Sequence, residues 1–178
     1  MVRKTLITVH MYLAAFFAPA VLLVAISGGL YLVGVKGNVE LDSIYSSDLV
    51  LDGKSSSLKA DVDKLLNAAG ASDYRFEYIS VKNDTLYTRP TSAEHYVIKL
   101  GSAGLEVLHA RPNLQSRMIE LHKGHGPKAF KTFQKLFAIG LVCIIASGLW
   151  LGLSAAKLRR STLLTAGAGA VVFALLLL

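Results

Sequence analysis

The chain has 178 residues, of which 53% are hydrophobic, and its mean hydropathy of +0.48 is too high for an ordinary soluble domain. Its formal net charge is +7, but residues 36–128 hold all twelve carboxylates and twelve positive charges, so the excess positive charge flanks the apolar segments and indicates membrane orientation, not nucleic-acid binding. Cys143 is the single cysteine, which excludes a disulfide framework or a cysteine zinc site within one chain.

The first predicted element is a transmembrane helix over residues 5–35, after a short basic start at residues 1–4. This uncharged segment exceeds the about 20 residues that cross a bilayer core and the about 7–15 residues of a signal-peptide core, so we predict that it stays in the membrane. His10 lies one to two turns inside it, and the small residues Ala14 and Ala18 leave room beside the imidazole for a flat ring system. The alternative is that His10 reaches the lipid headgroups, as polar residues near helix ends often do.

Residues 36–128 are predicted to form a small α+β domain outside the membrane, together with a helix at the membrane surface. Apolar side chains at helical spacing predict one amphipathic helix over residues 57–69. Four later segments rich in aromatic and β-branched residues are separated by tight-turn sequences, which predicts an antiparallel meander with the helix packed on one face. The predicted strands cover residues 74–82, 85–88, 95–100 and 105–110. A second amphipathic helix, over residues 114–122, is the one predicted to lie at the membrane surface.

Two further transmembrane helices are predicted, over residues 129–156 and 161–178, joined by a basic loop at residues 157–160. Short segments rich in lysine and arginine mark the cytoplasmic side of a membrane protein. The basic residues of this loop and of the N-terminus therefore place both segments in the cytoplasm and the α+β domain outside. The predicted fold class is an α-helical membrane protein with three transmembrane helices and one small extracytoplasmic domain.

Three histidines near the ends of the predicted spans are the candidate site residues: His10 near the inner surface, and His122 and His125 near the outer one. A neutral imidazole is a good ligand for haem iron and for other metals. About 25 residues separate His10 from the outer end of its helix, so the inner and outer sites are expected to lie on the order of 30 Å apart or more. One iron cannot bind both, whereas two separate redox centres would form a path for electrons across the bilayer.

The order of these features carries a resemblance to a known family. His10 precedes a long apolar span that closes in Ser27-Gly28-Gly29, and the small α+β domain follows. After this domain come Glu120-Leu121-His122-Lys123-Gly124, Gly140 and Ser147-Gly148-Leu149-Trp150. Over nearly its whole length the chain resembles the PepSY-associated transmembrane family, and the outer domain resembles a PepSY domain. Members of this family include haem-containing ferric reductases of the inner membrane.

The resemblance implies that the chain binds b-type haem, with His10 and His122 as axial ligands of the haem iron and His125 as a further cofactor-binding candidate. It implies an oxidoreductase of the bacterial inner membrane, with a periplasmic main domain, that reduces Fe(III) or a ferric chelate in support of iron uptake. Each site has too few histidines in one chain for bis-histidine ligation, unless His125 turns to complete the outer one. We therefore expect a homodimer that holds two haems, with His10 and His122 each paired with its copy. A membrane quinol or a separate cytoplasmic reductase is the expected electron donor, because the sequence lacks a nucleotide-binding glycine motif.

Two other functions remain open. A cofactor-free, membrane-anchored PepSY interaction module would modulate a transporter or a protease through its outer domain. A metal-binding accessory protein would use His122 and His125. The absorption spectrum distinguishes these functions, because reduced bis-histidine haem gives sharp bands that neither alternative predicts.

Overall fold

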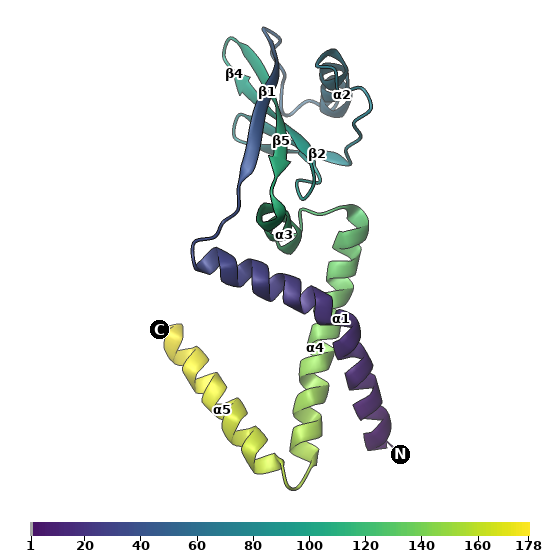
Figure 1. Ribbon diagram of the computed structural model, residues 1–178, viewed down its shortest axis with the longest axis vertical. Coiled ribbons are helices and arrows are strands. Elements are labelled where there is room, and N and C mark those ends of the chain that lie inside the picture. Colours follow the sequence, from purple (N-terminus) through teal and green to yellow (C-terminus); the bar gives the residue numbers. More distant parts are fainter. Residues whose placement is uncertain (1) are drawn as a thin grey trace. The chain divides into compact units, whose positions relative to one another are not determined.

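The computed structural model describes residues 2–178, and the chain divides into two compact units. One unit contains Leu22–Gln134, and the other contains the N-terminal residues up to Val21 together with Lys135–Leu178. The first unit holds a β-sheet and two short helices beside segments of longer helices (Figure 1). The second unit is helical.

Three helices of the described chain are long and apolar enough to cross a membrane: α1 (Val2–Leu32), α4 (Lys128–Ser154) and α5 (Arg159–Leu176). This finding confirms the three predicted transmembrane helices. The helix α1 continues through Pro19 and ends at Leu32, earlier than predicted, because Gly34 adopts a φ of +91° that L side chains rarely tolerate.

The sheet has five strands in the order β1-β5-β4-β3-β2, and all neighbouring strands are antiparallel (Figure 1). The strands are β1 (Val39–Ser47), β2 (Tyr78–Lys82), β3 (Thr85–Arg89), β4 (His95–Gly101) and β5 (Gly104–Pro112). The last four form the predicted meander, although β2 begins later than expected. The strand β1 was not among the predicted strands. It pairs with β5, which is distant in the sequence, and contains a register shift between Ser43 and Tyr45.

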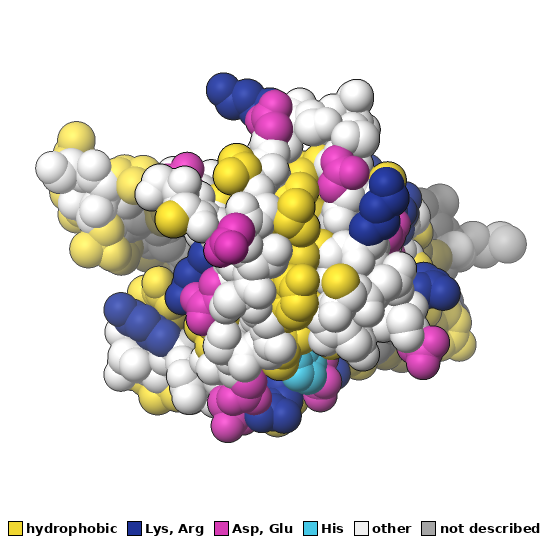
Figure 2. Space-filling view, turned by 90° about the horizontal axis from the view of Figure 1, so that it is seen from above, with side chains coloured by type: hydrophobic (Ala, Val, Ile, Leu, Met, Phe, Trp, Pro, Cys, Tyr) yellow, Lys and Arg dark blue, Asp and Glu magenta, His cyan; other side chains and the backbone are white. Residues whose placement is uncertain are grey.

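The core of the outer domain lies between the sheet and the helix α2 (Leu58–Ala68). One face of this helix buries Leu58, Val62, Leu65 and Leu66 against sheet residues that include Leu86, Ile98 and Val107. The structure therefore confirms the predicted packing of one helix on one face of the meander. Figure 2 shows acidic and basic side chains scattered over the face seen from above, on both sides of a narrow run of hydrophobic side chains. This mixture of charges agrees with the neutral middle of the sequence.

The helix α3 (Leu114–His122) follows β5 and has the predicted bounds. Asn113 caps its first turn, accepting a hydrogen bond from the backbone N–H of Ser116 at 3.0 Å. The Gln115 side-chain amide donates to the carbonyl oxygens of Val35 at 3.0 Å and Ser27 at 3.3 Å. These buried hydrogen bonds tie α3 to the end of α1, so they set the position of the histidine at the C-terminus of α3.

Candidate functional site

His10 lies on α1, and its Nδ1 is 2.8 Å from the Oγ of Ser147 on α4. The Ser147 hydroxyl has one hydrogen, which it donates within its own helix, to the carbonyl oxygen of Cys143 at 2.6 Å or of Ile144 at 3.1 Å. Its oxygen is therefore the acceptor toward His10, and Nδ1 is the donor. A neutral imidazole protonated at Nδ1 carries its free lone pair on Nε2, the state that can bind a metal.

The contact between α1 and α4 around His10 depends on glycines. A Cβ added at Gly148 would lie 3.3 Å from Cε1 of His10, so the imidazole packs against the backbone of α4. Farther along both helices, the buried ring of Phe17 lies against Gly140, and its centroid is 5.7 Å from that of Phe137. Close approach at these glycines brings the imidazole within reach of the Ser147 hydroxyl.

His122 has the same arrangement in the other unit. Its Nδ1 is 3.2 Å from the Oγ of Ser27, which is fully buried and donates its hydrogen to the carbonyl oxygen of Val24 at 3.3 Å. A Cβ added at Gly28 would lie 3.5 Å from Cε1 of His122. With the Ser27 hydrogen on the Val24 carbonyl oxygen, Nδ1 of His122 is the donor and the lone pair lies on Nε2, as at His10.

The chain thus contains two histidine sites of one design, in which a serine hydroxyl accepts from Nδ1 and the following glycine lies beside Cε1. The hydrogen bonds of Ser27 and Ser147 were not predicted from the sequence. The recurrence of a Ser-Gly pair in two spans, each with a histidine elsewhere in the chain, was the available signal. Which serine meets which histidine depends on contacts between helices.

His125 has a carboxylate partner in place of a serine. Gly124, with a φ of +78°, ends α3 and lets the backbone N–H of His125 donate to the carbonyl oxygen of Glu120 at 2.9 Å. This turn also brings Nδ1 of His125 within 2.7 Å of the Glu120 carboxylate. His122 and His125 therefore have different partners, although they are three residues apart.

Glu120 is the centre of a polar network on the outer domain. Burial raises the pKa of this carboxyl, but hydrogen bonds from Thr91, Lys123 and His125 outweigh burial and lower the pKa from 4.5 to about 2. The Nζ of Lys123 lies 3.0 Å from Oε1, and the guanidinium of Arg89 lies 3.5 Å from Oε2. The carboxylate is consequently ionised at every physiological pH.

The lowered pKa of Glu120 predicts how the stability of the outer domain depends on pH. The folded pKa lies below the ordinary value, so the network stabilises the folded domain fully above about pH 4.5, and this stabilisation is lost as the pH falls toward 2. Glu120→Gln should lower the free energy of unfolding by about 1.5–3 kcal/mol at pH 7 and by progressively less below pH 4.5. Denaturant titrations followed by the near-ultraviolet circular dichroism of the domain's tyrosines measure this difference.

The control for this measurement is Glu106→Gln. Glu106 forms an ion pair with Lys99 at 3.6 Å, and both side chains are more than one-third exposed, so its loss should cost about 0–1 kcal/mol. A pH-independent effect of Glu120→Gln down to pH 3 would contradict the prediction.

The other two histidines lie in the sheet and have partners there. His95 is buried, its Nδ1 bonds to the carbonyl oxygen of Ala93 at 2.9 Å, and burial lowers its pKa. His109 lies 3.2 Å from a carboxylate oxygen of Glu94 and stacks on Tyr96. Within residues 2–178, no three His, Cys, Asp or Glu side chains converge to hold a metal ion.

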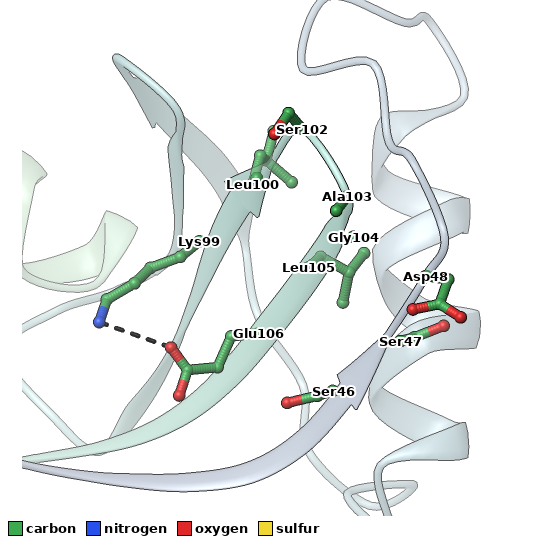
Figure 3. A pocket seen from close by; sticks show the side chains of 11 residues that line it. Ser46, Ser47, Asp48, Lys99, Leu100, Ser102, Ala103, Gly104, Leu105 and Glu106 are labelled. Carbon is green, nitrogen blue, oxygen red and sulfur yellow. Dashed lines mark ion pairs between the residues drawn. The ribbon is translucent and has the colours of Figure 1, made fainter.

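An open depression lies at the far end of the sheet, between the end of β1 and the turn that joins β4 to β5 (Figure 3). Five of its eleven lining residues are serine or glycine, and the Lys99–Glu106 ion pair borders it (Figure 3). The depression is at the start of β5, whereas α3 follows the end of this nine-residue strand, about 30 Å away. It is therefore separate from the His122 site.

A family model described as PepSY_TM-like matches residues 53–178, which include α2 to α5 with His122 and Ser147, and which exclude His10 and Ser27. The comparisons with curated proteins and with solved structures found no match.

Proposed function

The chain belongs to the PepSY_TM-like family, and on the basis of this membership and of its two histidine sites we propose that it is a b-haem protein that carries electrons outward across the bacterial inner membrane. Its electron acceptor is Fe(III) or a ferric chelate in the periplasm, and the Fe(II) product supports iron uptake. The chain is then an oxidoreductase of the ferric reductase type.

The single observation that carries this proposal is the repeated hydrogen bond from a histidine Nδ1 to a serine Oγ. At both His10 and His122 this hydrogen bond uses Nδ1, so the lone pair of Nε2 is left for a ligand. Metal-ligating histidines characteristically donate their other ring N–H to a fixed acceptor, which orients the ring and raises its basicity. The donor set therefore fits the axial positions of haem iron.

The glycine beside each imidazole also fits this ligand. Gly148 and Gly28 carry no Cβ, so the backbone of each glycine can lie close to Cε1 of the neighbouring imidazole. When bound, haem b would supply a one-electron Fe(III)/Fe(II) couple at each site. The protein's part would be to hold each imidazole in one tautomer and one orientation.

The direction of electron transfer is proposed from the sequence. The basic segments at the N-terminus and at residues 157–160 place the start of α1, with His10, toward the cytoplasm. A membrane quinol or a cytoplasmic reductase would donate electrons there, and His122 would serve the outer site. A quinol releases two electrons and two protons on oxidation, so one quinol would reduce two Fe(III) ions.

The second axial ligand at each site is proposed to come from a second copy of the chain. His10 is the only histidine in residues 1–21 and 135–178, so its unit cannot supply another imidazole. A two-fold axis would pair His10 with the partner's His10, and His122 with the partner's His122, in a homodimer with two haems. His125 remains a further candidate ligand at the outer site if its Nδ1 stays bonded to Glu120 and its Nε2 turns to the iron.

The absorption spectrum of the purified full-length protein, recorded with its mass in detergent, tests this proposal. We expect sharp α and β bands on reduction, about one haem per chain and the mass of a dimer. A monomer with six-coordinate haem would overturn the homodimer. Protein expressed with ample haem that shows no such bands would overturn the haem proposal and favour a cofactor-free module that modulates a transporter or a protease.

A further inference from the structure

We propose that Ser147 and Ser27 are positioning residues that fix the tautomer of His10 and His122, and that their unequal hydrogen bonds place the haem potential lower at the His10 site than at the His122 site. The part about potentials rests on the proposed function. The part about tautomers concerns the protein alone.

The first step is the direction of the hydrogen bonds. Ser147 sits on the helix α4, and its hydroxyl lies 2.6 Å from the carbonyl oxygen of Cys143, one turn back, so we assign its hydrogen to that carbonyl. The hydroxyl then has only lone pairs left for His10. In a lipid environment water does not compete for these groups, so the serine holds the proton on Nδ1.

The hydrogen bonds of Ser27 have the same directions. It is fully buried, and its hydroxyl lies between the Val24 carbonyl oxygen and the ring of His122. Free histidine in water favours the tautomer protonated at Nε2, which cannot bind a metal through Nε2. Each serine therefore selects the ligating tautomer before any ligand arrives.

The third step is the difference between the two sites. The distance from Nδ1 to Oγ is 2.8 Å at His10 and 3.2 Å at His122, so the bond at His10 is the stronger. A stronger bond from Nδ1–H makes the imidazole a more basic ligand, which favours Fe(III) and lowers the reduction potential. Electrons would therefore move downhill from the His10 site to the His122 site, the outward direction.

The alternative is that both serines only satisfy their own hydroxyls within a helix, as serines in apolar helices do. Ser154 provides the matched control, because it lies on the same helix α4 and its Oγ donates to the Leu151 carbonyl oxygen at 3.3 Å, and it is not bonded to a histidine. Ser154→Ala removes the same atoms from the same helix. Ser147→Thr and Ser27→Thr keep the hydroxyl.

The first experiment uses the haem-free full-length chain with ¹⁵N-labelled histidine. We expect the ring nitrogen shifts of His10 and His122 to report the tautomer protonated at Nδ1. Ser147→Ala should move His10 alone to the tautomer protonated at Nε2, and Ser27→Ala should move His122 alone. Unchanged ring shifts in both alanine variants would overturn the tautomer part of the inference, whether or not the protein binds haem.

The second experiment is a redox titration of the haem-loaded protein in lipid nanodiscs, with electron paramagnetic resonance of the ferric state. Two potentials are expected in the native chain. Ser147→Ala should shift the lower one upward, Ser27→Ala should shift the higher one by a smaller amount, and each threonine variant should restore the native value. Haem binding at the altered site should weaken by about 10–100-fold.

Each remaining outcome is decisive. Potentials that do not move in either alanine variant, or that move as far in Ser154→Ala, would overturn the inference about potentials. If an alanine variant loses haem and the threonine variant at the same position binds it, the inference is supported. If neither variant binds haem, the inference is contradicted. A native chain without haem would overturn the proposed function, while the ring nitrogen shifts still decide the tautomers.

Discussion

Replacing His10 by alanine should remove about half of the bound haem and abolish electron delivery to Fe(III), and His122→Ala should do the same at the other site. Each imidazole is proposed as an axial ligand at a different centre, so loss of one should leave the other centre intact. Electron delivery should nevertheless fail in both variants, because the centres act in series. Haem content, the absorption spectrum and the rate of Fe(III) reduction measure these effects.

The matched control for the histidine variants is His109→Ala. His109 lies on the strand β5, where it contacts Glu94 and Tyr96, and it belongs to neither site. This variant should keep its full haem content and its activity. Equal and complete haem loss from His10→Ala and from His122→Ala would indicate one shared site or a folding failure, and full haem retention in both would exclude the two ligands.

The second large effect is expected at Gly140. This glycine is buried, and a Cβ built on it would overlap Cε2 of Phe17 and would lie 2.8 Å from Cδ2 and Cζ. The ring of Phe17 is 6% exposed and also contacts Phe137, so it has little room to move away. Gly140→Leu should therefore separate α1 from α4, at a cost of about 1–3 kcal/mol or more.

This separation should reach the histidine site on the same pair of helices. His10 lies two helical turns from Phe17, about 10 Å along α1, so it should lose its contact with Ser147. We expect Gly140→Leu to lose the haem bound by His10 and to keep the outer domain folded, as measured by haem content and by hydrogen exchange in the sheet.

Gly167→Leu is the control for this substitution. Gly167 lies in α5, where a Cβ would meet no atom within 4 Å, so leucine should fit without displacing a neighbour. Combining Gly140→Leu with Phe17→Ala should recover part of the lost haem, because it removes the ring that leucine would strike. Native haem content in Gly140→Leu alone would show that this contact does not set the site.

The turn at the end of α3 shows how far local sequence can define a site. Glu120 is followed four residues later by Gly124 and then by His125, and a glycine at this position is a common helix stop. The contact between the carboxylate and the imidazole follows from this local turn, so it could be inferred from the sequence. The bonds from Glu120 to Thr91 and Arg89 could not, because they join the helix to a loop and a strand that lie far away in the chain.

The elements that depend on local periodicity could be predicted from the sequence alone. Three uncharged apolar segments predict the membrane-spanning helices, one amphipathic segment predicts α2, and four alternating segments predict the meander. These predictions succeed because the buried apolar side chains follow the repeat of each kind of element. The sequence also singled out two candidate ligands: His10 from its residue type and its depth in the first span, and His122 from its residue type and its place before the second span.

The contacts between these elements are visible only in the folded protein. The tertiary structure added β1, which pairs with β5 so that residue 39 lies opposite residue 112. Because this pairing joins segments that are distant in the chain, β1 has little local pattern in its sequence. The tertiary structure also showed that Ser147 meets His10 and that Ser27 meets His122. Such pairs depend on the register between helices. Packing at Gly140 and the hydrogen bonds of Gln115 set this register. The periodicity within one helix carries no information about it.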